Sequence, residues 1–378
     1  MTRTLEILDR LIAYPTVSRT SNLALVDWAE DLLVNAGWDV TRIPSPDGTK
    51  AGLHARIGPK AAGGICLSAH TDVVPADGQP WTRDPFKLTR EGDRLFGRGT
   101  TDMKGFLASA LALAERAGGT ALSRPLSLVL SYDEEIGCVG IQEMIPALHP
   151  LMMAPDLVIV GEPTSMGAAT GHKGKAALRV TCKGEAGHSA MAPNFLNAIH
   201  VAADFVAELR NVQHDLAGGP LDTAYDIPYS TVHVGRIDGG RALNIVPDST
   251  TLEVEVRYLA ETTADAMIQL VTQAAHRTEA RFERSNLIEI TQTGGYPGLE
   301  QPVDAGLTSL IGDLTGSPET TKIAFGTEGG VFAALGLKTL VIGPGNMSTD
   351  GHQPDESLPL SELRACDAMM DRVLSKLT

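Results

Sequence analysis

Short apolar runs alternate with segments of helical periodicity along this chain, and this alternation limits its fold more than any other feature. The apolar runs lie at residues 64–69, 126–132 and 156–160, and their length predicts buried strands. Residues 25–36 and 103–114 repeat apolar side chains at helical spacing, which predicts helices. Strands separated by helices form a parallel sheet with helices on both faces. We therefore expect a three-layer α/β domain with a mixed, mostly parallel sheet.

The pattern changes near residue 176. Apolar and polar residues alternate one by one at 176–183, 231–234 and 252–258, which is typical of strands with one buried face. Helical periodicity follows at 199–209 and at 262–281. This order predicts a two-layer α+β domain, inserted at residues 176–286, that interrupts an α/β domain made of residues 1–175 and 287–378. Helices near 304–314 and 329–335 and a strand at 339–342 then resume the first pattern.

Charge and cysteine content exclude several classes of protein. The 46 acidic residues outnumber the 31 basic ones, so we expect no nucleic-acid partner and no binding to anionic membranes. No run of apolar residues is long enough to span a bilayer. Residues 1–15 have the pattern of an amphipathic helix and not of a signal peptide. The four scattered cysteines, without a CxxC pair, predict reduced thiols and a cytoplasmic protein.

The predicted strands end in residues that can bind metal or move protons: His70 and Asp72, Asp133 to Glu135, and Glu162. Taken singly, such groups are most often structural elements or solvated acidic turns. In open α/β sheets, however, ligands bind where the carboxyl ends of the strands meet. The joint placement of these residues therefore indicates a site. Within this site, one of the adjacent residues Glu134 and Glu135 can bind a metal ion while the other accepts a proton.

Two further candidates lie in loops. Asp102 follows a glycine-rich turn, GRGTTDMKG, and either caps the helix that follows or offers its carboxylate to two cations. His352 lies in a loop rich in glycine and proline, where a single histidine is usually surface. The chain has no GxxxxGK[ST] motif and no GxGxxG opening after a strand, which argues against a phosphate or dinucleotide enzyme.

Six segments resemble the co-catalytic zinc amidohydrolase and carboxypeptidase family, which includes acetylornithine deacetylases, succinyl-diaminopimelate desuccinylases and aminoacylases. The segments are SAHTDVVP, GRGTTDMKG, YDEEIGCVG, GEPTSM, GEAGHSAMAP and GPGNMSTDGHQPDE, and they occur in family order. GEPTSM followed by GHKGK, together with HQPDE, is most similar to the acetylornithine deacetylases. The resemblance implies hydrolysis of the N-acyl amide of an L-amino acid, first of all N-acetyl-L-ornithine in arginine biosynthesis.

The resemblance also implies a role for each candidate. Two zinc ions, which cobalt or manganese can replace, would be bound by five residues: His70, Asp102, Glu135, Glu162 and His352. Asp102 would bridge the two ions, with His70 on one and His352 on the other. Glu134 would be the general base, and Asp72 would orient His70.

The inserted domain would act as a lid and as the interface of a homodimer. By resemblance, His188 would reach the partner's active site and donate a hydrogen bond to the oxyanion, Arg257 would hold the substrate carboxylate, and Asn244 would contact the substrate. Each has a simpler alternative: His188 as a polar loop residue, and Arg257 as an ion-pair partner of Glu253 or Glu255. Cys138 is expected to serve in packing. His172 and the loop at 325–330 have no assigned role.

Other functions stay open from the sequence alone. Within the enzyme class, the alternatives are another N-acyl-amino-acid deacylase, similar to the desuccinylases, or a dipeptidase. From a different class, the chain could be a non-catalytic metal-binding scaffold. That alternative predicts a missing ligand or base, whereas Glu134 and all five expected ligands are present.

Overall fold

The computed structural model describes residues 2–378, which divide into two compact units. The first unit comprises residues 2–171, Leu299–Ile323 and Thr327–Thr378. The second comprises His172–Gly298 and Ala324–Gly326. Among residues 2–378, no helix combines the length and the apolar character that a membrane crossing requires.

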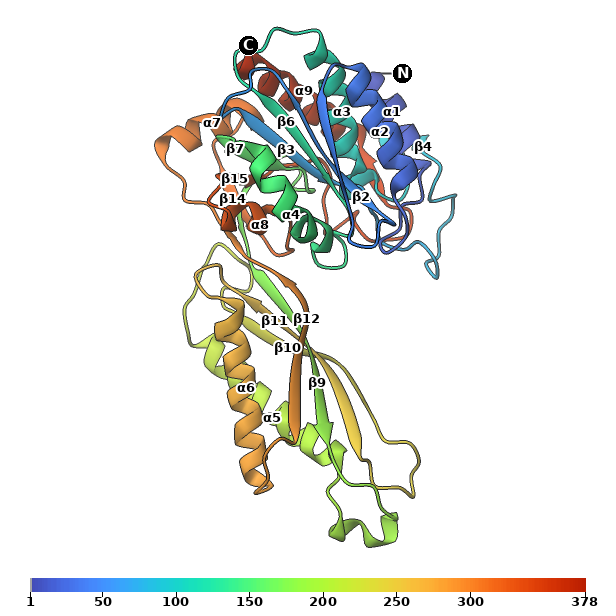
Figure 1. Cartoon of the computed structure of the whole chain (residues 1–378), viewed down its shortest axis with the longest axis vertical. Helices are drawn as coiled ribbons and strands as arrows, with labels where there is room; N and C mark the ends of the chain where they lie inside the picture. Colours follow the sequence, from blue (N-terminus) through green and yellow to red (C-terminus); the bar gives the residue numbers. More distant parts are fainter. Residues whose placement is uncertain (1) are drawn as a thin grey trace. The chain divides into compact units, whose positions relative to one another are not determined.

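The first unit is built on a sheet of nine strands (Figure 1). Along the sheet the order is β1 (Asp39–Pro44), β2 (Ala51–Ile57), β6 (Leu126–Ser131), β3 (Ile65–His70), β7 (Leu157–Val160), β15 (Thr339–Val341), β8 (Ala168–His172) and β13 (Leu299–Glu300), with β14 (Thr320–Ile323) paired to β8. The central pairings β6–β3, β3–β7 and β7–β15 are parallel. The pairings β1–β2, β2–β6 and β15–β8 are antiparallel. The predicted mixed sheet is therefore confirmed, and its parallel pairings are the ones at its centre.

Helices cover both faces of this sheet. Every residue of β3, β6 and β7 is buried, as expected for strands covered on both sides. One face packs against helices α1 (Arg3–Ile12), α2 (Leu23–Asn35), α3 (Gly105–Gly118), α7 (Ala305–Thr315) and α9 (Leu360–Leu377), whose apolar residues form one core cluster with it. Helix α4 (Val139–Met152) packs on β1, β2 and β6, and α8 (Gly329–Ala334) packs on β7 and β15. The buried residues of α4 and α8 lie outside that cluster, on the opposite face.

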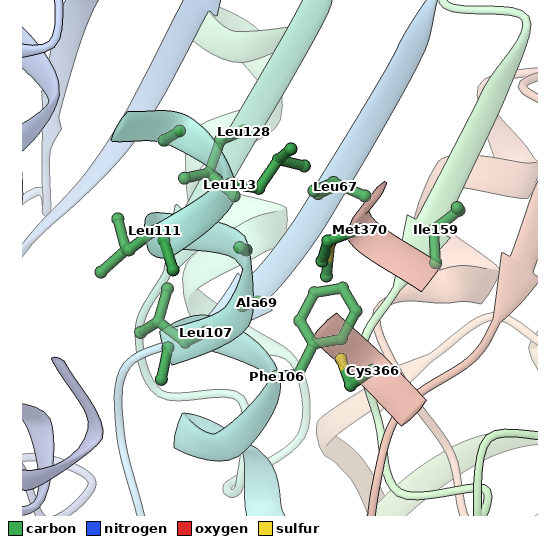
Figure 2. Packing of buried hydrophobic residues seen from close by; sticks show 14 of the residues in the cluster. Leu67, Ala69, Phe106, Leu107, Leu111, Leu113, Leu128, Ile159, Cys366 and Met370 are labelled. Carbon is green, nitrogen blue, oxygen red and sulfur yellow. The ribbon is translucent and has the colours of Figure 1, made fainter. Parts of the chain in front are cut away.

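Phe106 of α3 belongs to the buried apolar cluster of the first unit (Figure 2). Its ring is fully buried beside Cys366 and Met370 of α9. A Cβ atom added at Gly161 would lie 2.0 Å from this ring, so only glycine lets the chain pass Phe106 on leaving β7. This close approach fixes the path of the backbone that carries Glu162.

The second unit is a two-layer α+β structure. Its antiparallel sheet has the order β10 (Thr231–Gly239), β11 (Ser249–Tyr258), β9 (Gly174–Lys183) and β12 (Ile288–Tyr296). Helices α5 (Ala198–Ala217) and α6 (Ala264–Arg281) cover one face (Figure 1). The predicted end of this unit at residue 286 was wrong, because β12 pairs with β9 and belongs to the same sheet. Without β12, β9 would be an edge strand with unpaired backbone groups.

A small third sheet joins distant parts of the first unit. Strand β16 (Ser357–Pro359) pairs with β5 (Arg94–Phe96), which pairs with β4 (Thr89–Glu91). This sheet holds the segment after His352 beside the turn that leads to Asp102.

Candidate metal centre

The candidate residues converge at the carboxyl edge of the central parallel strands. His70 is the last residue of β3, Asp133 to Glu135 follow β6, and Glu162 follows β7. Because β6, β3 and β7 are parallel neighbours, their carboxyl ends meet at one edge. The topology thus brings together acids that are far apart in sequence.

Asp102 lies between two histidines. Its Oδ1 is 3.0 Å from His70 Nε2, and its Oδ2 is 3.0 Å from His352 Nε2. A glutamate accompanies each histidine: Glu162 Oε1 lies 3.6 Å from His70 Nε2, and Glu135 Oε2 lies 2.8 Å from His352 Nε2. The result is two triads that share one aspartate. In each triad, the ligand atoms lie within 4.8 Å of one another.

The charges of this cluster are suited to bound cations. Burial, followed by the negative charge of Asp102, raises the pKa of Glu135 to about 7 and the pKa of Glu162 well above its ordinary value. Glu135 Oε1 is buried and accepts no hydrogen bond from residues 2–378. Buried carboxylates this close together repel one another unless positive charge separates them. Two imidazoles and three carboxylates are a donor set that suits zinc and similar divalent ions. These residues therefore fit a pair of divalent cations.

The carboxylates around Asp102 also raise the pKa values of the two histidines. Burial lowers their pKa values, but hydrogen bonds to Asp102 and the nearby carboxylates outweigh this effect. The pKa of His352 is raised to about 10, and that of His70 well above its ordinary value. Burial alone would raise the pKa of Asp102, yet hydrogen bonds from His352 and His70 hold it below its usual range.

Asp72 fixes the orientation of His70. The Nδ1 atom of His70 lies 2.9 Å from the backbone carbonyl oxygen of Asp72 and 3.5 Å from its Oδ1. Since a carbonyl oxygen only accepts, Nδ1 carries a proton, and Nε2 faces Asp102. The Asp72 carboxylate also accepts hydrogen bonds from Ser18 Oγ at 2.7 Å and from the backbone N–H of Glu134 at 3.0 Å. One carboxylate thereby connects β3, the N-terminal segment and the turn after β6.

Glu134 is buried beside the two triads and receives a hydrogen bond from Cys138. Cys138 is fully buried, in agreement with a packing role, and its thiol Sγ also lies 3.1 Å from Glu134 Oε1. Burial and the charge of Glu134 raise the pKa of the thiol well above its ordinary value, which keeps it a donor. Burial and the charge of Glu135 likewise raise the pKa of Glu134, against the opposing charge of His70.

Asp102 does not cap the following helix. Helix α3 begins only at Gly105, its N-cap position is Lys104, and no side chain donates or accepts a capping hydrogen bond there. The peptide bond between Asp102 and Met103 is cis. With its side chain turned to His70 and His352, the capping alternative is wrong for this residue.

Residues 66–376 match the protein family described as Peptidase family M20/M25/M40. The chain belongs to this family. It is 33% identical to an acetylornithine deacetylase from Pectobacterium carotovorum subsp. carotovorum, over 98% of this chain and 96% of that protein. It is also 33% identical to an acetylornithine deacetylase from Shigella sonnei, over 94% of this chain and 92% of that protein.

Solved structures share the fold of this M20 family member. An M20 family metallo-carboxypeptidase from Sulfolobus solfataricus superposes with a TM-score of 0.80 at 19% identity, over 100% of this chain and 99% of the other. A dinuclear metal-binding M20 peptidase from Bacillus subtilis superposes with a TM-score of 0.68 at 15% identity, over 99% of this chain and 98% of the other. The chain is thus a hydrolase of a metal-dependent family, with candidate ligands in place.

Glu328 is a buried acid of the M20 site for which the sequence predicted no role. Glu328 lies in the segment Phe325–Gly330, just before α8, and is 1% exposed. Its Oε2 accepts a hydrogen bond from Ser68 Oγ at 3.2 Å, whereas Oε1 has no hydrogen-bond partner among residues 2–378. Burial raises its pKa to about 7. In the sequence, a glutamate just before a short helical segment is typical of a helix start. This pattern therefore does not reveal that the Glu328 side chain is buried.

In the second unit of this M20 protein, His188 and Asn244 lie side by side. The backbone N–H of Ser189 donates to the Asn244 carbonyl at 3.0 Å, and His188 forms a β-bridge with Ile245. Both His188 and Asn244 are exposed. The imidazole Nδ1 of His188 accepts a hydrogen bond from the Ala190 N–H at 3.1 Å, which leaves the proton of the neutral ring on Nε2.

Arg257 lies at the far end of the same sheet. It is near the end of β11, whereas the segment that carries Asn244 precedes the start of that strand. The eight residue steps from Ser249 to Arg257 span roughly 27 Å of strand. Arg257 Nε donates to Glu255 Oε1 at 2.6 Å, so the ion pair foreseen as an alternative is present. The structure thus brings His188 and Asn244 together and keeps Arg257 apart from them.

Proposed function

We propose that this chain hydrolyses N-acetyl-L-ornithine to L-ornithine and acetate, with two zinc ions bound by His70, Asp102, Glu135, Glu162 and His352. The observation that carries this proposal is the pair of triads sharing Asp102, with Glu134 buried beside them. The substrate is chosen because relatives with 33% identity over nearly the whole chain are acetylornithine deacetylases. The reaction would serve arginine biosynthesis in the cytoplasm. The four cysteines are free and buried, as is usual for proteins of that reducing compartment.

Glu134 performs the proton transfers in this proposal. When bound, the cations supply Lewis acidity toward the amide carbonyl and make water easier to deprotonate. Glu134 accepts a proton from the water that adds to the carbonyl carbon, and then delivers that proton to the amine nitrogen as the C–N bond breaks. The Cys138 thiol holds Oε1 of Glu134, which leaves Oε2 for the water. Asp72 keeps His70 in the tautomer that presents Nε2.

His188, Asn244 and Arg257 bind the substrate. Arg257 holds the α-carboxylate, because a guanidinium can present several donors in one plane. His188 donates a hydrogen bond from Nε2 to the oxyanion that forms on the carbonyl oxygen. A separation of roughly 27 Å along β11 is far longer than an acylated amino acid. Arg257 and the His188–Asn244 pair of one chain therefore serve different sites, in a homodimer formed through the second unit.

A substrate panel tests the proposed reaction. The enzyme reconstituted with zinc is assayed with N-acetyl-L-ornithine, N-succinyl-L,L-diaminopimelate, N-acetyl-L-methionine and a dipeptide. We expect kcat/KM to be highest for N-acetyl-L-ornithine. A higher value for the succinylated substrate or for the dipeptide identifies a desuccinylase or a dipeptidase instead. Absence of turnover with every substrate, at full zinc occupancy, favours the non-catalytic scaffold.

A further inference from the structure

The aspartate shared by the two triads and the exposed histidine of the candidate metal centre are far apart in the sequence. Asp102 and His352 are 250 positions apart in sequence, and no covalent or local constraint sets their distance. Strands β5 and β16 bring the two segments side by side. At the end of that pairing, the backbone N–H of Gly97 donates to the Glu356 carbonyl at 3.0 Å. Something beyond this pairing must fix the turn that carries Asp102.

The Glu356 carboxylate fills that role with four hydrogen bonds. Its Oε1 accepts from the backbone N–H groups of Thr101 at 2.9 Å and of Asp102 at 3.1 Å. Its Oε2 accepts from the backbone N–H of Gly99 at 3.0 Å and from Arg98 Nη1 at 2.7 Å. The side chain is 1% exposed. All four partners are donors, so the geometry requires two accepting oxygens, which an ionised carboxylate has.

We propose that Glu356 is a positioning residue that sets the Asp102 carboxylate relative to His352. Glu356 follows His352 by four residues, so its backbone belongs to the loop of the histidine. Its carboxylate accepts a hydrogen bond from the backbone N–H of Asp102. One residue thus connects the two segments whose side chains meet at 3.0 Å. The inference rests on the proposed metal centre and does not depend on which amide is hydrolysed.

Substitution of one oxygen by an amide tests this arrangement. Glu356→Gln keeps the shape of the side chain, but either orientation of the amide turns an NH₂ group toward two N–H donors. Residues that orient metal ligands typically contribute about 10- to 100-fold in metal affinity. We expect the dissociation constants for zinc, measured by competition with a chromogenic chelator on the metal-free enzyme, to rise by about that factor. Glu356→Asp retains the charge with a shorter reach, and we expect a smaller rise in the same direction.

Two controls separate positioning from general destabilisation. Asp355→Asn alters the adjacent acid, whose carboxylate accepts from Thr82 N and Oγ1 instead, and should leave zinc affinity unchanged. Val373→Ala opens the buried core of α9 and should lower the melting temperature without weakening zinc. The inference is overturned if both folded Glu356 variants bind two zinc ions with wild-type affinity, if Val373→Ala weakens zinc as much as they do, or if the wild-type enzyme binds no zinc.

Discussion

An equal mixture of two impaired variants, Glu134→Gln and His188→Ala, is expected to regain about one quarter of the wild-type activity, if the enzyme is a two-fold symmetric dimer. Loss of the base in the first variant should lower kcat by about 10²- to 10⁴-fold. Loss of one oxyanion donor in the second should lower it by about 10²- to 10³-fold. Each homodimer is therefore nearly silent, and recovered activity stands out clearly.

Recovery is expected because His188 lies at the opposite end of β11 from Arg257, so the two residues of one chain serve different sites. If His188 serves the neighbouring site, a heterodimer has one site with both defects and one site with neither. After random subunit exchange, half of the dimers are heterodimers, so about one quarter of all sites are intact. Acetate release is measured after denaturation and refolding of the mixture, with native mass spectrometry to count heterodimers. Heterodimers present in the expected amount without recovered turnover would refute action across the interface.

Three further predictions concern the substrate, the metal and the fold. Arg257→Ala should fold, bind both metals and lose at least about 100-fold in kcat/KM, or about 2.7 kcal/mol; Glu253→Ala, an exposed acid of the same strand, should retain kcat/KM, and normal turnover by Arg257→Ala would exclude a carboxylate-binding role. His352→Ala and Glu162→Ala should each lower bound zinc after dialysis by about one ion per chain, and retention of two ions in both variants would contradict the assignment of separate triads. Burial lowers the pKa of His54 to about 4, so its contribution to stability is complete above pH 6.5 and is lost as the pH falls toward 4. His54→Leu should therefore gain about 3 kcal/mol in the free energy of unfolding relative to wild type between pH 6.5 and 4, and parallel pH curves in chemical denaturation would contradict this.

The central strands could be predicted from sequence because burial on both faces leaves a continuous apolar signal. Strands β6 and β7 lie at Leu126–Ser131 and Leu157–Val160, within one or two residues of the predicted runs. The glycines and polar residues of β12, Ile288–Tyr296, weaken its alternation, and four of its nine residues are exposed. Its place in the sheet is set by pairing with β9, which no local pattern reveals. The boundary of the second unit was misplaced for this reason.

His70, Glu135 and Glu162 could be proposed as ligands because the carboxyl ends of parallel strands meet. Asp102 and His352 lie in loops and were proposed from the family resemblance, and the supporting roles of Cys138 and Glu356 could not be proposed at all. Cys138 lies four positions after Glu134, and Glu356 lies four positions after His352. Neither pair is on a regular helix, so the spacing carries no geometric meaning in the sequence. The path of the Asp102 backbone depends on amide donors to Glu356 that lie about 250 residues away in sequence. Such contacts arise only from tertiary structure.

Activity as a function of bound zinc tests the central claim most directly. The metal-free enzyme is titrated with zinc(II) and assayed for acetate release from N-acetyl-L-ornithine, with bound metal measured in the same samples. We predict that activity increases with bound zinc until about two ions are held per chain and then stays constant, because the two triads share Asp102. Full activity in the metal-free enzyme, or no acetate release with two zinc ions bound, would contradict the proposed function.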